Sequence, residues 1–250
     1  MRLPASLLDR PITHRGLHDM ADGRPENSVE GIRAAIAANY GIEIDLQLSK
    51  DGVPMVFHDY HLARLTGESG PVAQRSAAEL QAITLTGGET GIPTLAEVLA
   101  LVDGQVPLLI EIKDQDGQMG PNVGPLEQAA AAALQGYTGD VAVMSFNPHA
   151  VTAFGKAAPD VPRGLVTSAY DYADWAPLKH SVCDRLREIP DYEATGACFI
   201  SHEAEDLTRP RVAEIKAQGA KVLCWTIKSA ATEAEARKVA DNVTFEGYLA

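Results

Sequence analysis

Cysteine is scarce in this chain, which has only three among its 250 residues: Cys183, Cys198 and Cys224. An odd number without Cys-x-x-Cys spacing excludes a disulfide framework and a cysteine-ligated zinc site. Unpaired cysteines are typical of a reducing compartment, so we expect a cytoplasmic protein.

Positive charge is also in short supply, because 21 lysines and arginines face 34 aspartates and glutamates, for a net charge of -13. Phosphate groups of nucleic acids and anionic lipid surfaces repel a chain this acidic. We therefore expect no nucleic-acid partner and no membrane-surface partner, although a local basic pocket is compatible with this balance.

Long hydrophobic runs are absent, and Ala129–Leu134 is one of the longest. A membrane span needs roughly 20 apolar residues, so no span is expected. Pro4 and Asp9 interrupt the N-terminal residues, which do not resemble a signal peptide.

What the chain does have is a regular alternation of strand and helix patterns. The predicted strands are Ile12–Arg15, Ile42–Leu48, Leu108–Lys113, Val141–Phe146, Gly164–Thr167, Cys198–His202, Val222–Ile227 and Val243–Phe245. The predicted helices are Ser28–Asn39, Leu95–Val102, Leu126–Leu134, Pro148–Ala157, Tyr172–Leu186, Arg209–Gln218 and Ala230–Ala240. Eight such units predict an α/β protein of the TIM (β/α)8 barrel class. An open doubly wound sheet is disfavoured because no Gly-rich phosphate fingerprint follows the first strand.

We expect a single barrel domain over residues 1–250 with a small insertion after the second strand. The segment Val53–Ile92 separates that strand from the next strong helix and has its own strand-like run, Val53–Phe57. We interpret residues 53–92 as an inserted subdomain or lid over one face. Pro4–Asp9 is predicted to plug one end of the barrel.

Acidic residues interrupt two of the predicted strands. Because strand residues alternate between faces, Glu43 and Asp45 share one face, and the neighbouring isoleucines and leucines share the other. If the apolar face packs on helices, the carboxylates point into the barrel. Glu111 and Lys113 repeat this pattern at the carboxyl end of another strand, where barrel active sites lie.

Several inward carboxylates repel one another, by about 4 kcal/mol for a pair ~4 Å apart at an effective dielectric of ~20. One divalent cation, Mg²⁺ or Ca²⁺, would neutralise Glu43, Asp45 and Glu111 with the oxygen ligands that such ions prefer. The alternative is an ion-pair ladder of these acids with Arg15 and Lys113 and no metal.

Two histidines follow strand-like runs, where catalytic residues of barrels lie. His14 and His58 are predicted to share general acid–base catalysis near neutral pH. Arg15 and Lys113 bring positive charge to the same mouth, which suits a phosphate ester. His18 is assigned to a loop without a role, and His202 is only a weak candidate for lining the site.

Two further features each have two readings. In the first interpretation, Asn27 or Ser28 caps a helix and Glu30 completes a capping box. In the second, Glu26 or Asn27 belongs to the functional site at the barrel mouth. Trp225, near the end of the seventh strand, either walls the substrate pocket or fills the core.

These residues occur in the order seen in the glycerophosphodiester phosphodiesterase family, which the chain resembles from Pro11 to Thr226. The motifs that carry the resemblance are His14-Arg15-Gly16, Glu26-Asn27-Ser28, Glu43-x-Asp45, Asp51-Gly52, His58-Asp59, Ile92-Pro93-Thr94-Leu95-x-Glu97-Val98-Leu99, Glu111-x-Lys113 and Trp225-Thr226. The sequence departs from the family pattern at Lys228, where Asn is common, and at Thr244–Tyr248, where an Asp and a nearby Pro are common.

The resemblance implies metal-dependent hydrolysis of a small glycerophosphodiester to sn-glycerol 3-phosphate and an alcohol. It implies Glu43, Asp45 and Glu111 as metal ligands and His14 and His58 as the catalytic pair. Arg15 and Lys113 match the phosphate contacts, and we assign Trp225 to the substrate pocket. The attacking group is water or the substrate's own glycerol hydroxyl. Two alternatives are a phosphodiesterase for lysophospholipid head groups and a non-catalytic barrel that binds a phosphorylated ligand.

Overall fold

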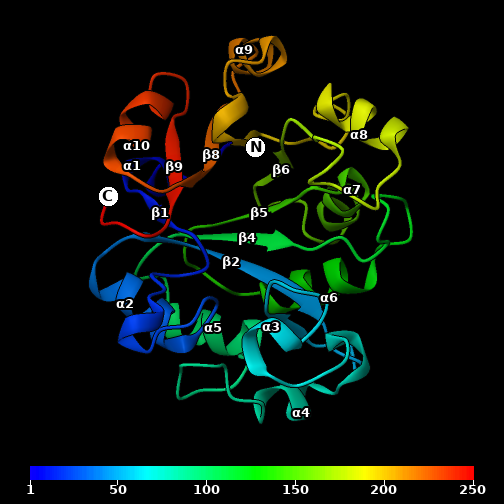
Figure 1. The fold of residues 1–250 in the computed structure, drawn as a ribbon. Coiled ribbons are helices and arrows are strands. Elements are labelled where there is room, and N and C mark those ends of the chain that lie inside the picture. Colours follow the sequence, from blue (N-terminus) through cyan, green and yellow to red (C-terminus); the bar gives the residue numbers. More distant parts are fainter.

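A computed structural model describes residues 1–250, and its centre is a closed barrel of eight parallel strands (Figure 1). The strands are β1 (Ile12–Thr13), β2 (Gly41–Leu48), β4 (Leu108–Ile112), β5 (Val141–Ser145), β6 (Arg163–Thr167), β7 (Phe199–Glu203), β8 (Lys221–Ile227) and β9 (Asn242–Phe245). The barrel closes at β1, where Ile12 pairs with Gly41 of β2 on one side and with Thr244 of β9 on the other. The predicted TIM barrel is confirmed.

Helices pack around the barrel between successive strands (Figure 1). They are α2 (Val29–Ala37), α5 (Leu95–Val102), α6 (Pro125–Ala133), α7 (Pro148–Ala157), α8 (His180–Arg187), α9 (Pro210–Ala217) and α10 (Ala230–Ala236). The prediction of a helix over Tyr172–Leu186 was wrong in its first half. Pro177 disfavours helical conformation in the residue before it, and the helix begins only at His180.

The alternation predicted for β2 and β4 is the one the structure has. Ile42, Ile44 and Leu46 are fully buried in the layer between the sheet and the helices α2, α5 and α6. The opposite face of the same strands turns into the barrel. Near the amino-terminal ends of the strands, Leu109 packs inside the barrel with apolar residues of other strands. Nearer the carboxyl ends, the inward-facing side chains are the carboxylates.

The short helix α1 (Ser6–Asp9) closes the amino-terminal end of the barrel. Its Leu7 is fully buried and packs with Leu109, Phe199 and Leu223 from the interior. The side chain of Asn242, on β9, donates hydrogen bonds to the carbonyls of Leu7 and Arg10, at 2.9 and 2.5 Å. This is the position that the plug prediction gave to Pro4–Asp9.

The segment between β2 and α5 forms a small unit beside the barrel. It contains β3 (Pro54–Val56), α3 (Ala63–Thr66), α4 (Ala77–Gln81) and the 3-10 turn η2 (Val72–Gln74). Its apolar side chains, among them Phe57, Leu62 and Leu80, form a buried cluster of their own. Strand β3 runs antiparallel to β2 and lies outside the closed barrel.

Two further findings concern the whole chain. None of its helices combines the length and the apolar character that crossing a membrane requires. All three cysteines are free thiols, two of them buried.

Candidate functional site

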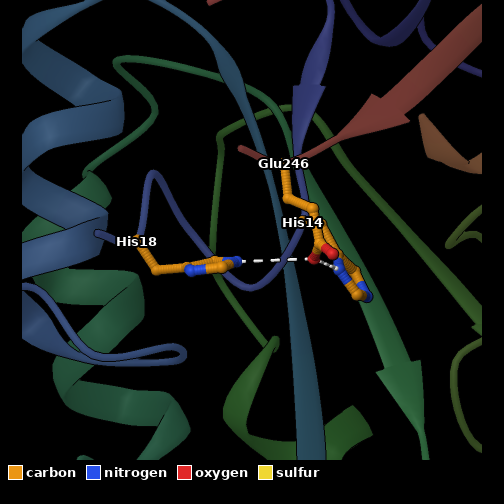
Figure 2. Close-up of side chains that lie close together, drawn as sticks. All are labelled: His14, His18 and Glu246. Carbon is orange, nitrogen blue, oxygen red and sulfur yellow. Dashed lines mark hydrogen bonds and ion pairs between the residues drawn. The ribbon is translucent and has the colours of Figure 1, made fainter. Parts of the chain in front are cut away.

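His14 lies just beyond β1 at the mouth of the barrel and is held by a carboxylate (Figure 2). Its backbone N–H donates to Phe245 on the neighbouring strand β9. Its Nδ1 is 2.6 Å from Oε2 of Glu246, and Glu246 also lies 3.5 Å from Nε2 of His18. Hydrogen bonds from His14 and His18 keep the pKa of Glu246 far below its usual range, so Glu246 is a carboxylate and Nδ1 donates. Burial lowers the pKa of His14 itself.

His58 reaches the same mouth from the inserted segment. We expected it to follow the strand-like run Val53–Phe57, and it follows β3, which is antiparallel to β2 and lies outside the barrel. The hairpin turns the chain back along β2, where the Phe57 N–H donates to the Asp45 carbonyl. The side-chain amide of Gln47 then donates to the His58 carbonyl at 3.0 Å. His58 is thereby placed beside the acidic residues of β2.

His58 also has its own carboxylate. Its Nδ1 lies 2.7 Å from Oδ1 of Asp59, and Arg64 of α3 binds the same carboxylate at 2.6 and 2.8 Å. Burial alone would raise the pKa of Asp59, but these hydrogen bonds from His58 and Arg64 lower it below its usual value. Asp59 is therefore an acceptor, and Nδ1 of His58 is the donor.

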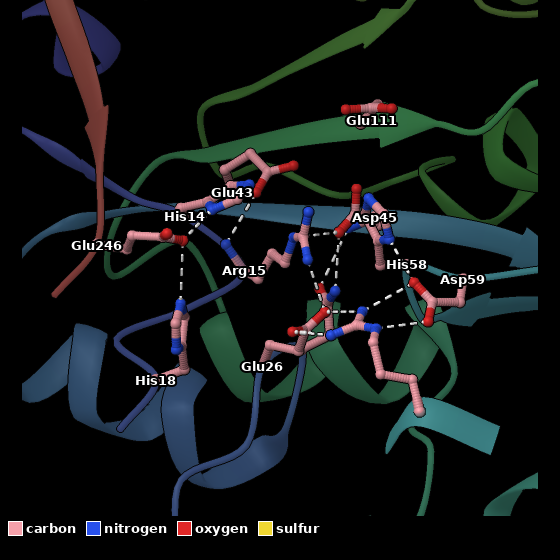
Figure 3. Close-up of polar contacts among 12 residues, drawn as sticks. His14, Arg15, His18, Glu26, Glu43, Asp45, His58, Asp59, Glu111 and Glu246 are labelled. Carbon is pink, nitrogen blue, oxygen red and sulfur yellow. Dashed lines mark hydrogen bonds and ion pairs between the residues drawn. The ribbon is translucent and has the colours of Figure 1, made fainter. Parts of the chain in front are cut away.

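Three acidic side chains meet between the two histidines (Figure 3). Glu43 and Asp45 come from β2 and Glu111 from β4, where Asp45 and Glu111 are register partners. They are 2%, 1% and 6% exposed, and their nearest oxygens all lie within 4.8 Å of one another. Burial, and then repulsion from Asp45 and Glu111, raises the pKa of Glu43 well above its usual value. The three predicted ligands are thus brought together.

Two cations lie against this cluster, as the sequence predicted. The Lys113 ammonium is 2.7 Å from Asp45 and 2.6 Å from Glu111. The Arg15 guanidinium lies 3.4 Å from Asp45 and donates to Glu26 at 2.8 Å. Although burial opposes ionisation, Lys113, His58 and Arg15 lower the pKa of Asp45. The ion-pair ladder therefore exists, but its two cations do not balance three carboxylates.

The acidic cluster fits a hard divalent cation. Its donors are all carboxylate oxygens, which Mg²⁺ and Ca²⁺ prefer, and one negative charge is left over after Arg15 and Lys113 are counted. The Glu43 carboxylate accepts a single hydrogen bond, from the backbone N–H of Arg15, so it has oxygen lone pairs to offer a metal.

The Glu26–Ser28 segment combines both readings given to it. Ser28 caps α2 by accepting from the Gly31 N–H, while the fully buried Asn27 holds Asp45. Asn27 donates to the Asp45 carboxylate at 2.9 Å and accepts from the Asp45 N–H. The predicted capping box is wrong, because Glu30 accepts instead from Thr90 and from the Glu89 N–H.

Several functional candidates were missed by sequence reasoning. Glu246 and Asp59 hold the two histidines (Figure 3). Arg64 connects Asp59 to Glu26 with bonds of 2.6–2.8 Å. Lys228 lies 3.0 Å from Glu246, so two of the positions at which the sequence departs from the family pattern lie against each other. An acidic residue just after the last barrel strand was the available signal for Glu246.

His202, a weak candidate for the site, does not line it. It is fully buried within β7, and its two ring nitrogens are engaged by Thr167 at 2.7 Å and by Asp206 at 3.2 Å. Trp225, in contrast, lines the cavity between the histidines and donates its indole N–H to the Ser201 carbonyl at 3.0 Å.

Two cavities that share part of their lining lie at this mouth. A small one of about 80 Å³ is lined by both histidines, Glu43, Glu111 and Trp225. A larger one of about 450 Å³ lies on the His58 side and shares His58, Glu111, Lys113 and Phe146 with the first. The arrangement places two oriented imidazoles and an acidic cluster around one small space, with room for a larger group beside His58.

The chain is similar to several known proteins. The family model described as the glycerophosphoryl diester phosphodiesterase family matches residues 14–243. A putative glycerophosphodiester phosphodiesterase of Bacillus subtilis, YhdW, is 27% identical over 234 residues, which cover 90% of this chain and 88% of that one. A glycerophosphodiester phosphodiesterase of Caldanaerobacter subterraneus is 31% identical over 165 residues, which cover 62% and 65%. Among solved structures, a phosphodiesterase of Oleispira antarctica in complex with its product sn-glycerol 3-phosphate is 25% identical, with a TM-score of 0.77 and 97% and 94% coverage.

Proposed function

The chain belongs to the glycerophosphoryl diester phosphodiesterase family, and we propose that it hydrolyses glycerophosphodiesters to sn-glycerol 3-phosphate and an alcohol by metal-assisted, paired-histidine catalysis. The observation that carries the mechanism is the pair of carboxylate-bound imidazoles. Each histidine uses Nδ1 for its carboxylate, so Nε2 of each is left for the substrate. Both rings line the same small cavity as Glu43 and Glu111.

The phosphodiester would lie against the cationic side chains of this cavity. Arg15 offers a planar fork of N–H donors for the phosphate oxygens, and Lys113 adds a point charge. Glu43, Asp45 and Glu111 would hold one divalent cation, Mg²⁺ or Ca²⁺, which would supply charge neutralisation to the phosphate. Trp225 would form an apolar wall for the glycerol carbons.

We assign the two histidines different roles from the position of the larger cavity. The leaving alcohol needs room, and the 450 Å³ cavity opens beside His58. His58 would therefore give its Nε2 proton to the departing alkoxide. His14, on the other side, would take the proton from the attacking water or glycerol hydroxyl. Segment 53–92 would act as the inserted unit that brings His58, Asp59 and Arg64 to the barrel. The free thiols support a reducing, cytoplasmic location.

The test is release of sn-glycerol 3-phosphate from glycerophosphocholine, with EDTA and then with Mg²⁺ or Ca²⁺ added back. We expect release only with the metal, and its loss in His14→Ala and His58→Ala. His149→Ala is the matched control, because His149 is exposed at the start of α7. If a folded sample releases no product from any of several glycerophosphodiesters with either metal, the barrel binds a phosphorylated ligand or cleaves another diester.

A further inference from the structure

The larger cavity has a wall of aromatic rings. Phe146 and Trp175 line it, with ring centroids 4.8 Å apart and planes at 63°. Trp175 is supported from behind by the buried Tyr170, 4.7 Å away, and Phe146 also contacts Trp225 at 5.5 Å. The Met119 side chain lies beside them. Because each ring is fixed by another ring, the wall exists before a ligand arrives.

The rest of the lining is polar and includes three carboxylates beside His58, Tyr60 and His61. Asp59, Glu111 and Asp114 face the cavity with one ammonium, that of Lys113. Lys113 is turned to the catalytic side, where it is bound by Asp45 and Glu111. Asp59 is likewise paired with Arg64, at 2.6 Å, so Asp114 is the carboxylate of this lining that no cationic side chain binds, and its charge makes the cavity attractive to a cation.

Asp114 is fixed as a carboxylate acceptor in this lining. It is 5% exposed and accepts hydrogen bonds from the backbone N–H groups of Asp116, Gly117 and Met119, at 3.0, 2.8 and 3.0 Å. The side-chain amide of Asn147 donates to it at 2.8 Å. With four donors already bound, Asp114 contributes negative charge to the cavity but little further hydrogen bonding.

Aromatic faces combined with hydrogen-bonded carboxylates select one kind of cation. A primary ammonium group needs acceptors for its own N–H donors, whereas a quaternary ammonium has no donors and interacts well with ring faces. A neutral polyol would gain from neither the rings nor the charge.

We propose that this cavity binds a quaternary ammonium group carried by the leaving alcohol, so that choline esters are favoured substrates. This inference rests on the proposed hydrolysis and adds to it the chemical class of the head group. The phosphodiester would lie at Arg15 and the acidic cluster, with the ammonium group against the wall formed by Phe146 and Trp175, on the His58 side.

The test compares glycerophosphocholine with its neutral isostere, the 3,3-dimethylbutyl ester, which has carbon in place of the charged nitrogen. We expect kcat/KM to be about tenfold higher for the choline ester, the scale of a desolvated cation–π contact. Trp175→Leu should bring the ratio close to one. Tyr172→Leu, in the same loop but outside the cavity lining, should leave the ratio as in the wild type.

A second measurement needs no turnover. Free choline is titrated with the protein, and the NMR signal of its methyl protons should move upfield through the ring currents of the cavity. The shift should disappear in Trp175→Leu, and 3,3-dimethylbutan-1-ol should show none.

The outcomes separate this proposal from the hydrolysis on which it rests. Equal kcat/KM for the two esters, with no choline shift, overturns the ammonium site and leaves the hydrolysis standing. A choline shift in a protein that cleaves neither ester supports the ammonium site and overturns the hydrolysis.

Discussion

Single residues at the mouth of the barrel are arranged in two pairs, each a histidine with its own carboxylate. His14 is bound by Glu246 and His58 by Asp59, at 2.6 and 2.7 Å. A carboxylate on Nδ1 fixes the ring orientation and stabilises the imidazolium form. The two histidines differ in the cavities that they line, since His58 lines both the small cavity and the one of about 450 Å³, whereas His14 lines only the small one.

That difference gives a prediction about the leaving group. His58→Ala should lower kcat for glycerophosphocholine by roughly 10²- to 10⁴-fold, the usual contribution of a general acid. With a p-nitrophenyl glycerophosphodiester the loss should be much smaller, because nitrophenolate leaves without a proton. His14→Ala should lower turnover of both substrates equally.

The same two variants contain their own control, because the p-nitrophenyl ester reports whether the rest of the site is intact. If the activated ester rescues His14→Ala and not His58→Ala, then the acid and base roles are reversed.

A second residue-scale prediction concerns Glu246. Glu246→Gln keeps the size of the side chain but removes its charge, so the His14 ring loses the partner that fixes its donor nitrogen. We expect kcat to fall by roughly 10- to 100-fold, the usual effect of losing an orienting partner, with little change in KM. Glu205→Gln, an exposed residue of the turn after β7, is the matched control. Full activity in Glu246→Gln would show that His14 needs no such support.

The position of Glu43 and Asp45 could be predicted from sequence because strand alternation leaves only one inward face. Glu246 could not be found in this way, since it follows the last strand, where no periodicity applies. His58 was chosen for its strand-like neighbours, yet its place depends on an antiparallel return along β2. Whether residues 53–57 pair parallel or antiparallel with β2 depends on tertiary contacts, so their own sequence does not reveal it.

At the scale of elements, the sequence predicted every barrel strand to within two residues at each end. Buried parallel strands leave a strong apolar signal, so they are found reliably. The loop at Tyr172–Lys179 was mistaken for helix because its apolar residues have helical spacing, although they pack as an aromatic wall: Trp175 contacts Phe146 and Tyr170. The interpretation of residues 53–92 as a lid stays a prediction.

The plug helix α1 allows a stability prediction. Leu7 is fully buried against the barrel interior, so Leu7→Ala should lower the free energy of unfolding by about 2–5 kcal/mol. Leu249→Ala is the control, because Leu249 is 74% exposed and should change stability by less than ~0.5 kcal/mol. Urea denaturation measures both. A loss as small as that of the control would mean that α1 does not contribute to the barrel core.

Strand β7 allows a pH prediction. Burial lowers the pKa of His202 below 6.5, so the unfolded chain binds a proton that the folded chain does not. Stability should therefore fall as the pH drops below about 6.5 and should be fully present above it. His14, whose pKa burial also lowers, adds to the same trend.

The check compares urea midpoints above and below this pH window. His202→Gln should reduce the drop in midpoint, while the exposed His149→Gln should keep the whole of it. The comparison is within each variant, so any loss of stability common to both pH values cancels. An unchanged drop in His202→Gln would exclude this histidine as its source.

At the scale of the whole molecule, the acidic cluster combines side chains of the neighbouring barrel strands β2 and β4. A cation bound to both strands should therefore stabilise the entire fold. A free Mg²⁺ or Ca²⁺ concentration about 100 times Kd should add ~2.7 kcal/mol to the free energy of unfolding. Glu111→Gln should remove most of this gain, while Glu205→Gln should retain it. Thermal unfolding with EDTA and with added metal measures the effect, and identical midpoints in the two conditions would contradict a metal site.

The closure of the barrel between β1 and β9 also determines when the chain can finish folding. During synthesis β1 emerges before the other barrel strands, but its partner β9 (Asn242–Phe245) emerges after all of them. Until then the nascent sheet is open, with unpaired backbone groups along β1 and β8. Open edges of this kind can pair with other chains. The ribosome-bound protein therefore passes through a stage in which β1 has been synthesised but its partner β9 has not. We expect the protein to depend on chaperones at this stage.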